Sequence, residues 1–468
     1  MQKTKIICTL GPSSCDYKTV SKMMKAGMNV ARLNMSHGDL AYHQSLIDLV
    51  KKVRQDLNLA CAIMVDTRGP ELRIATFKDN KVTLKRGQTF TFTTREVEGD
   101  NTVVGLRFKQ LVNIAKVGKF IYANNGLLKF KITQVTDTDV VCKVMFGGEL
   151  SNNKSFAIPN VPFNIPYLSD IDKEHIKFAV ENNVESIACS FVNCKEDMLA
   201  VRELVTSLGG NQDLIAKIES EEGIKFLSEI IEVSDGIMVA RGDMGTEIPL
   251  EQIPAVQKQM IKSTVAKGKY VIVATEMLES MIEKRRPTRA ETTDVANAIY
   301  DGTTAIMLSG ESASGKYPVE AVKTMASIAA ASEKAINYEK RFSKSNISTM
   351  RDAISYSACS TAFALKAKAI LCFSHQGNSA RAISSYRPNC KILVLTTEEE
   401  VRHKLSFCWG ATSVVCPPID NTDDMIAKAN DIAKQLKIAK PGDTVIITSG
   451  IPVNAMGKTN LIKIHTIE

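Results

Sequence analysis

Two carboxylates and a nearby lysine are the residues of this sequence best suited to chemistry on a phosphoryl group. Glu219 and Asp243 each follow a short apolar run, and Lys217 precedes Glu219 by two positions. In an extended strand, residues two apart point to the same face. Two carboxylates with substrate oxygens and water are the usual ligands of Mg²⁺, and a cation beside them would neutralise charge on a transferring phosphoryl group. The alternative is a set of ion-paired acids with a structural role.

Other polar residues near the ends of apolar runs offer ligands for anions and for a second cation. The planar guanidinium groups of Arg32 and Arg73 suit phosphate oxygens. The segment 241–245 has the small residues of a strand-to-helix turn, whose backbone N–H groups would bind a carboxylate. An oxygen-rich group suited to a monovalent cation comprises Asn34, Ser36, Asp66 and Thr67.

Eight short apolar runs indicate the elements that position these residues. Unbroken apolar runs are typical of parallel strands covered on both faces, and amphipathic stretches such as 17–25 and 254–266 lie between them. Eight such units predict a (β/α)8 TIM barrel, whose active site lies at the carboxyl ends of the strands. The runs are Ile6–Leu10, Asn29–Asn34, Ala62–Asp66, Ser186–Phe191, Leu214–Glu219, Gly236–Arg241, Val271–Thr275 and Ala305–Ser309.

Two regions depart from this pattern and predict further domains. Residues 71–163 contain short β-like segments separated by Gly, Asp and Asn turns, which indicates an all-β insertion after the third strand. Above the barrel mouth it would act as a lid; the alternative is a passive insertion. Residues 337–468 alternate apolar strands with helical stretches, as in a three-layer α/β domain. The barrel would then comprise residues 1–70 and 164–336.

The composition is that of an ordinary globular protein. The 468 residues carry a formal net charge of +8, with Lys and Arg dispersed along the chain, so we expect no nucleic-acid partner. Eleven cysteines occur singly, as expected for reduced thiols. The sequence has no apolar run of the roughly 18 residues that a membrane helix needs and no signal-type N-terminus. We therefore expect a cytoplasmic protein without a membrane partner.

Several segments together form a pattern far more specific than any one of them. They are Thr4–Pro12, Met28–His37, Leu214–Ile224, Arg241–Asp243, Pro287–Glu291, Asp294–Ala298 and Met307–Glu311. In these segments the chain resembles the pyruvate kinase family, and the resemblance covers essentially its whole length. It implies phosphoryl transfer between phosphoenolpyruvate and ADP, giving pyruvate and ATP, the last step of glycolysis.

The resemblance assigns substrate roles to residues at the predicted rim. Lys217 would stabilise the phosphoryl group in transfer, with Arg32 assisting. Thr275 and the backbone at Gly242 and Asp243 would hold the substrate carboxylate. Thr275 would also lie near the carbon that is protonated when enolpyruvate becomes pyruvate, with water as an alternative proton donor.

Metal and nucleotide roles follow from the same resemblance. Glu219 and Asp243 would bind Mg²⁺ or Mn²⁺, and Glu71 matches the residue type that accompanies K⁺ dependence. The K⁺ ligands would be Asn34, Ser36, Asp66 and Thr67. The nucleotide contacts would be Asn34, His37, Arg73, Lys154 and Pro12.

Five positions depart from the family pattern. Arg68 stands where Lys is common, which keeps the charge but changes its geometry. Asn124-Asn125 replaces a usual pair of aspartates in the lid, Glu276 replaces a common Gln after Thr275, and Ala157 replaces a common Asn.

A loop in the last domain suggests regulation. Residues 374–379 resemble the family's effector-phosphate loop, and hydroxyls with successive N–H groups suit a phosphate. Its residues are Ser374, His375, Gln376, Gly377, Asn378 and Ser379. The loop 450–457 lacks the Arg and Trp that sugar-bisphosphate-activated relatives use, so we expect a different effector, such as a sugar phosphate, or a vestigial site. The family is usually tetrameric, which predicts a homotetramer.

Two other functions remain as alternatives. A metal-dependent aldolase-type lyase acting on pyruvate-like substrates would not need Lys217, the K⁺ ligands or Arg73. A catalytically silent relative with a binding or regulatory role would be expected to lack Lys217, Glu219, Asp243 or Thr275, all of which are present.

Overall fold

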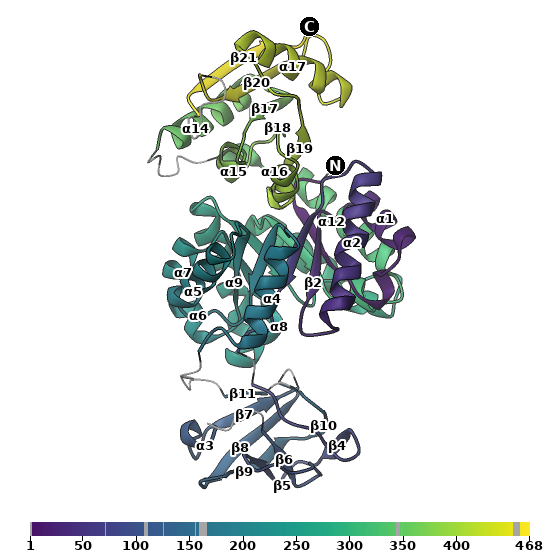
Figure 1. Ribbon diagram of the computed structural model, residues 1–468, viewed down its shortest axis with the longest axis vertical. Coiled ribbons are helices and arrows are strands. Elements are labelled where there is room, and N and C mark those ends of the chain that lie inside the picture. The colour runs from purple at the N-terminus through teal and green to yellow at the C-terminus, as the bar shows by residue number, and fades with distance from the viewer. Residues whose placement is uncertain are drawn as a thin grey trace.

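The structure is a computed structural model that describes residues 2–70, 72–106, 111–124, 126–154, 156–158, 166–342, 347, 349–452 and 459–468. Three lobes follow one another along the long axis of the molecule (Figure 1). The barrel lies in the middle, the β-rich lid at one end and the C-terminal α/β lobe at the other. Because active sites of such barrels lie at the carboxyl ends of the strands, the direction of the strands shows which end of the barrel carries the rim.

The central lobe is a closed barrel of eight parallel strands within the described residues, which confirms the predicted (β/α)8 fold. The pairing of β1 with β16 closes the barrel. Every residue of these strands is buried apart from Asn34 at the end of β2, which explains the unbroken apolar runs. In barrel order the strands are β1 (Lys5–Thr9), β2 (Val30–Asn34), β3 (Ala62–Asp66), β12 (Ser186–Cys189), β13 (Asp213–Ile218), β14 (Gly236–Ala240), β15 (Tyr270–Ala274) and β16 (Ala305–Leu308).

Helices with local start and stop signals cover the outside of the barrel. Asp16 caps the first helix by accepting from the N–H of Thr19, and Gly27 ends that helix at a φ of 127°. Thr288 and Glu291 form a reciprocal capping box at the start of α10. The helices are α1 (Tyr17–Ala26), α2 (Leu40–Asp56), α4 (Asp170–Glu181), α5 (Lys195–Ser207), α6 (Glu221–Lys225), α7 (Leu227–Val233), α8 (Arg241–Glu247), α9 (Ile253–Ala266), α10 (Arg289–Asp301), α11 (Gly310–Ala313) and α12 (Pro318–Ala335).

The lid is a mainly antiparallel β structure inserted after β3, as predicted. Its core contains Phe90, Phe92 and Phe130, whose ring centroids lie 5.1–5.7 Å apart. Its elements are β4 (Lys81–Leu84), β5 (Thr89–Thr93), β6 (Val103–Gly105), α3 (Leu111–Ile114), β7 (Phe120–Ala123), β8 (Leu128–Val135), β9 (Asp139–Phe146), β10 (Gly148–Ser151) and β11 (Phe156–Ala157).

The C-terminal lobe is an α/β unit with a sheet in the order β19-β18-β17-β20-β21, in which only β21 is antiparallel to its neighbour. Apolar clusters lie on both faces of the sheet, as in a three-layer arrangement. Its elements are α13 (Tyr338–Arg341), α14 (Met350–Ala364), β17 (Ala369–Phe373), α15 (Asn378–Ser385), β18 (Lys391–Thr396), α16 (Glu399–Lys404), β19 (Ala411–Val415), α17 (Thr422–Gln435), β20 (Thr444–Ser449) and β21 (Leu461–Thr466).

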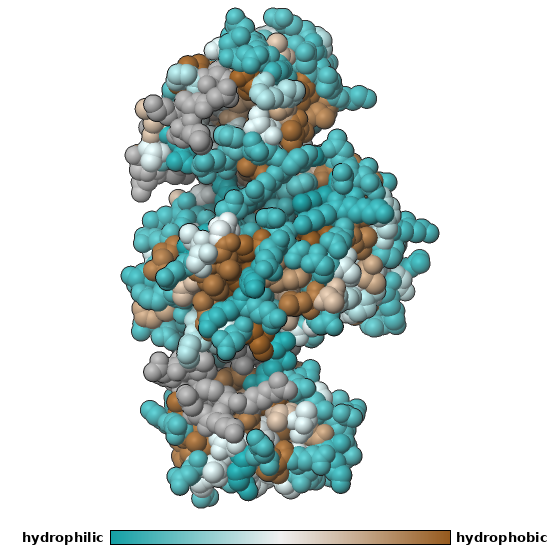
Figure 2. Space-filling view, in the orientation of Figure 1, coloured by the Kyte–Doolittle hydropathy of each residue, from teal (hydrophilic) through white to brown (hydrophobic). Residues whose placement is uncertain are grey.

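The visible surface is mostly hydrophilic. Figure 2 shows hydrophobic side chains in separate small patches over all three lobes. Among the described residues, no helix combines the length and the apolar character that a membrane span requires.

Candidate active site at the rim of the barrel

A buried ion-pair network joins the carboxyl ends of three barrel strands. Asp66, the last residue of β3, accepts from Nε of Arg32 (2.6 Å) and from Nζ of Lys217 (3.0 Å). Burial alone would raise the pKa of Asp66, but Arg32 and Lys217 outweigh it, so the pKa lies below its usual value. The Asp66 carboxylate is therefore charged and holds both cations in place.

Ser190 is a site residue that the sequence did not indicate. Its hydroxyl follows β12, accepts from Nζ of Lys217 (2.5 Å) and donates to the carbonyl of Thr67 (2.7 Å). The same oxygen lies 3.2 Å from Oδ1 of Asp66. A serine after an apolar run carries no special signal, and its position depends on β12 lying between β3 and β13.

Glu219 is buried beside the lysine at the end of β13. Oε1 lies 3.1 Å from Nζ of Lys217, and Oε2 accepts from the N–H of Phe191 (2.6 Å). Phe191 has a positive φ of 54°, a strained backbone for a large side chain, which aims its N–H at Glu219. Burial raises the pKa of Glu219 to about 7, because the nearby Asp243 also opposes its charge while Lys217 only partly offsets both. A further cation would stabilise this carboxylate.

Asp243 does not lie in a strand but in the first turn of α8, directly after β14. The sequence predicted a strand-to-helix turn over residues 241–245, and the chain turns into a helix at Arg241. Because β14 is the neighbour of β13, this turn still brings Asp243 to the side of the rim that holds Glu219. The two carboxylates thus follow adjacent strands, and Asp243 lies near enough to Glu219 to help raise the pKa of Glu219.

Thr275 lies next to this turn in a strained conformation. Its φ is 67° and that of Glu276 is 54°. The Thr275 hydroxyl accepts from the N–H of Gly242 (2.8 Å) and donates to the carbonyl of Ala274 (2.7 Å). These contacts bring together the three groups expected to hold a carboxylate: Gly242, Asp243 and Thr275.

Arg241 supports this strained turn. Its guanidinium donates to the carbonyls of Ala274 (3.2 Å) and Thr275 (2.5 Å), and pairs with Asp294 at 2.7 Å. Sequence reasoning treated Arg241 only as part of a turn motif. Its direction toward β15 could not be seen without knowing which strand follows β14 in the barrel.

The proposed ligands of the monovalent cation lie on the neighbouring strands β2 and β3. Asn34 is the register partner of Asp66, and its side-chain oxygen accepts from the N–H of Ser36 (3.2 Å). Thr67 follows Asp66 directly and donates its backbone N–H to Ala188 (2.9 Å). Asn34 and Asp66 thus lie side by side at the ends of β2 and β3, with Ser36 and Thr67 close behind them in the chain.

Comparisons with known proteins identify the family of this chain. The family model described as pyruvate kinase, barrel domain, matches residues 1–322, and that of the pyruvate kinase alpha/beta domain matches residues 352–465. The chain belongs to the pyruvate kinase family. It is similar to pyruvate kinases of Clostridium perfringens (44% identical over 474 residues) and Clostridium acetobutylicum (42% over 476 residues), with both chains covered completely. The pyruvate kinase of Staphylococcus aureus strain USA300 is 43% identical over 472 residues, which are all of this chain and 81% of that protein.

The residues expected at the nucleotide in a pyruvate kinase form two groups. Pro12 and His37 are exposed on the loops after β1 and β2. Arg73 and Lys154 lie instead on the two segments that connect the barrel to the lid: Arg73 donates to the carbonyl of Asn153 (3.2 Å), and the N–H of Ile74 donates to that of Lys154 (3.1 Å). A nucleotide between the groups would contact both barrel and lid. Glu71 lies outside the described residues.

Four of the five positions that depart from the pyruvate kinase pattern lie in the described residues, and one of them is Glu276 beside Thr275. Asn124 has a φ of 51° and donates to the carbonyl of Glu149 (3.3 Å). A side chain at the neighbouring Gly126 would contact Thr246 of α8 at 3.5 Å, so this lid turn lies beside the helix that carries Asp243. Arg68 has a buried Nε with no hydrogen-bond partner among the described residues. Asn125 lies outside them, and Ala157 forms the end of β11.

The loop expected to bind an effector phosphate connects β17 to α15. Gly377 adopts a left-handed φ of 81° and precedes the first residue of α15. The hydroxyls of Ser379 and Thr459 lie 2.5 Å apart, and His375 lies 3.4 Å from Oγ1 of Thr397. Ser374, Gln376 and Asn378 complete this strand–loop–helix turn. Most of the second expected loop, residues 453–458, lies outside the described residues.

Proposed function

We propose that this protein transfers the phosphoryl group of phosphoenolpyruvate to ADP, giving pyruvate and ATP, at the rim of its barrel. The observation that carries the proposal is the buried network of Arg32, Asp66, Lys217 and Glu219 beside the strained turn at Thr275. The network offers positive charge for a phosphoryl group, and the turn offers donors for a carboxylate. Phosphoenolpyruvate carries both groups.

Lys217 acts as a fixed positive charge. Burial favours its neutral form, but Asp66 and Glu219 outweigh burial and raise the pKa of Lys217 above its usual value. A lysine that keeps its proton stabilises the charge of a phosphoryl group in transfer and does not act as a general base. Arg32, held by Asp66 and by Thr9 (2.8 Å), presents its guanidinium to the same group.

Glu219 and Asp243 fit a divalent cation. Both offer hard oxygen ligands from adjacent strands, and the raised pKa of Glu219 reflects negative charge that Lys217 offsets only in part. Bound Mg²⁺ or Mn²⁺ supplies charge neutralisation at substrate oxygens. Asn34, Ser36, Asp66 and Thr67 fit K⁺, because each offers an oxygen at the ends of β2 and β3.

The turn at β14 and β15 orients the rest of the substrate. Thr275 and the backbone N–H groups of Gly242 and Asp243 hold the carboxylate, and Arg241 keeps the turn in place. This fixes the methylene carbon near Thr275, where enolpyruvate takes up a proton from water. Asn34, Pro12, His37, Arg73 and Lys154 contact ADP, so the lid would close over the nucleotide.

The first test is pyruvate formation from phosphoenolpyruvate and ADP with Mg²⁺, with and without K⁺. We expect K⁺-stimulated activity that falls by about 10³-fold or more in Lys217→Met, because a preorganised charge at the reacting group is lost. Lys225→Met, which removes an exposed lysine from the α6 segment that follows β13, is the matched control and should retain full activity.

Each outcome of this assay separates the alternatives. Turnover that does not need ADP would favour a lyase. Undiminished activity in Lys217→Met would contradict the assigned mechanism. Full activity without K⁺ would contradict the proposed potassium site and leave the rest of the mechanism in place. A protein that binds Mg²⁺ but is inactive in every condition would be a silent relative.

We further assign residues 1–70 and 164–336 to the catalytic barrel, 71–163 to the lid and 337–468 to a regulatory domain of a cytoplasmic homotetramer. The loop 374–379 would bind the phosphate of a sugar phosphate, and its hydroxyls and the start of α15 support this proposal.

Sedimentation analysis, which measures the mass of the assembly in solution, tests the homotetramer. A sugar monophosphate titration that leaves the half-saturating phosphoenolpyruvate concentration unchanged would remove the effector proposal.

A further inference from the structure

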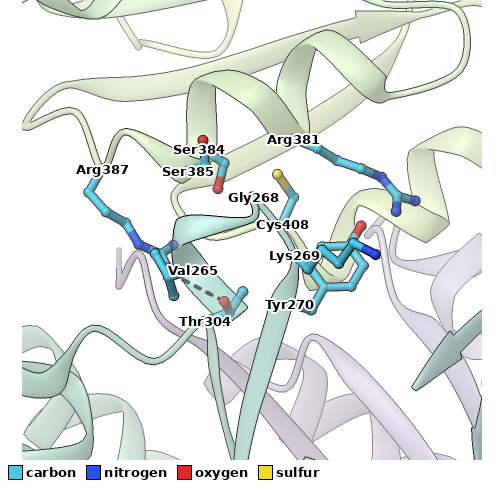
Figure 3. A pocket seen from close by; sticks show the side chains of 10 residues that line it. All are labelled: Val265, Gly268, Lys269, Tyr270, Thr304, Arg381, Ser384, Ser385, Arg387 and Cys408. Atoms are coloured by element: carbon cyan, nitrogen blue, oxygen red, sulfur yellow. Dashed lines mark hydrogen bonds between the residues drawn. The ribbon is translucent and has the colours of Figure 1, made fainter. Parts of the chain in front are cut away.

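A cavity lies far from the rim, between the base of the barrel and the C-terminal lobe. Its enclosed space is about 10 Å³, room for one water-sized group, within a recess of about 250 Å³ that is partly open to solvent. Figure 3 shows helix α15 above it, with Arg387 and Arg381 descending on opposite sides, and below it Tyr270 of β15 and Thr304, which directly precedes β16. The cavity therefore lies where the two lobes meet.

The two arginines are held by the barrel. Arg381 pairs with Asp213 at the start of β13 (2.7 Å), and its guanidinium lies 4.9 Å from the centre of the Tyr270 ring. Arg387 donates to the carbonyl of Gly302 (3.0 Å) and to the hydroxyl of Thr304 (3.2 Å). Both side chains are fixed before any ligand arrives, so the cavity is preformed.

Two donors that line this cavity have no hydrogen-bond partner among the described residues. They are the hydroxyl of Tyr270, a residue only 4% exposed, and Nε of Arg381. Buried polar atoms are nearly always satisfied, and an unsatisfied pair in one cavity points to a bound water or ion. Burial raises the pKa of Tyr270, so its phenol stays protonated and available as a donor.

The charge of the lining favours an anion over water. Lys269, Arg381 and Arg387 line the cavity, and none of its described lining residues is acidic. The three protons of Lys269 are directed to the backbone carbonyls of Ile231, Glu232 and Ser234, so its charge has no carboxylate in direct contact. An anion accepts from every donor present, whereas a water must also find acceptors for its own protons.

We propose that this cavity binds one small anionic group, a halide ion or a single oxygen of an oxyanion, between Tyr270, Arg381 and Arg387. The group would connect α15 to β15 and so strengthen the attachment of the C-terminal lobe to the barrel. The proposal is independent of the reaction at the rim, since none of these residues belongs to the proposed active site.

The protein contains its own reporter for this site. Trp409 is its single tryptophan. The guanidinium of Arg387 lies 4.7 Å from the centre of its ring, and Ser384, which lines the cavity, donates to its carbonyl (2.7 Å). Binding beside Arg387 should therefore change the tryptophan fluorescence.

The test is a fluorescence titration of the full-length protein with sodium bromide and, separately, with inorganic phosphate, at constant ionic strength set by sodium gluconate. We expect a saturable change with at least one of the two. Tyr270→Phe removes the hydroxyl but keeps the ring. This change should weaken binding and raise the half-saturating anion concentration at least tenfold. Tyr338→Phe is the matched control, because Tyr338 lies 5.9 Å from Trp409 and outside the cavity; it should leave the value unchanged.

The bromide and phosphate titrations together identify which kind of anion binds. Saturation with bromide alone assigns a free halide, and saturation with phosphate assigns an oxyanion oxygen. A merely linear loss of fluorescence with bromide together with no phosphate response, or equal weakening in both tyrosine variants, would overturn the proposal. If Tyr270→Phe does not fold, crystals of the unmodified protein grown with bromide test the proposal. We expect an anomalous peak beside Tyr270. Its absence would mean that the cavity holds water and not an anion.

Discussion

Strand β13 carries buried charges at both of its ends, and the two ends differ in how those charges are partnered. At the rim, Lys217 contacts Asp66, Glu219 and Ser190, all within the barrel lobe. At the base, Asp213 makes one ion pair among the described residues, and its partner Arg381 comes from the C-terminal lobe.

The difference separates a site for chemistry from a site for attachment. A network of buried charges is costly to form and contributes little net stability, so its retention at the rim indicates a functional requirement. A single pair across a boundary needs only to fix two lobes relative to each other. Substitutions at the rim should therefore lower both turnover and stability, whereas substitutions at the base should lower stability alone.

The largest effect is expected for Asp66→Asn at the rim. The change leaves Arg32 and Lys217 without their shared carboxylate, so kcat should fall by about 10²–10³-fold and the free energy of unfolding by about 3–5 kcal/mol. Steady-state kinetics and urea unfolding measure both. Asp56→Asn, an exposed carboxylate that bonds only Tyr17, is the control and should change neither. An unchanged kcat in Asp66→Asn would contradict the proposal that the rim end of β13 serves turnover and the other end does not.

At the base, Asp213→Asn should destabilise without slowing turnover. Arg381 loses its charged partner but is about one-fifth exposed, so the unfolding free energy should fall by about 2 kcal/mol, with kcat unchanged within a factor of about two. Glu149→Gln, in the exposed pair with Lys81, should cost below about 1 kcal/mol. A large loss of kcat in Asp213→Asn would mean that β13 couples the two ends.

His403, near the barrel end that faces the C-terminal lobe, makes the stability of the protein depend on pH. Burial, with Arg54 and Arg402 nearby, lowers the pKa of His403 to about 3, so it is neutral at pH 7 despite lying 3.6 Å from Glu399. Below its unfolded pKa of 6.5 the unfolded chain binds a proton that the folded protein does not, and stability falls as pH decreases toward 3. Between pH 7 and 5 the loss should be about 2 kcal/mol.

His403→Gln should remove that part of the pH dependence, and urea unfolding at pH 7 and pH 5 would measure it. His375→Gln, at an exposed histidine of the same lobe, should leave it in place. An identical pH dependence in His403→Gln and the unmodified protein would place the acid sensitivity elsewhere.

The smallest effect is expected for Ser190→Ala. Asp66 and Glu219 still hold Lys217, so the ammonium loses one of three partners and kcat should fall by about tenfold, or about 1.4 kcal/mol in the barrier. A positioning role predicts that kcat falls more than KM changes and that Ser190→Thr restores part of the rate. A change in KM alone would assign Ser190 to substrate binding.

The barrel was predictable because its strands have one simple property. Each is buried on both faces, and the predicted bounds differ from those observed by at most two residues. Lys217, Glu219 and Asp66 were predictable as charged residues at strand ends.

Other parts of the site depend on three-dimensional arrangement. Ser190 gains its role from the order of β3, β12 and β13 around the barrel, which no local pattern reveals. The positive φ of Thr275 and the support from Arg241 likewise depend on contacts between β14 and β15. Residue type and spacing identify groups that do chemistry more readily than groups that hold them.

The closure of the barrel between β1 and β16 has a consequence for how the protein is made. These strands are separated by roughly 300 residues, which a ribosome takes about 15–60 s to synthesise at 5–20 residues per second. The hairpin of β8 and β9 in the lid can form long before that, because its strands are adjacent in sequence. A growing chain therefore holds a folded lid on a barrel whose β1 edge is still open, and chaperones that shield such edges should matter most for this protein during synthesis.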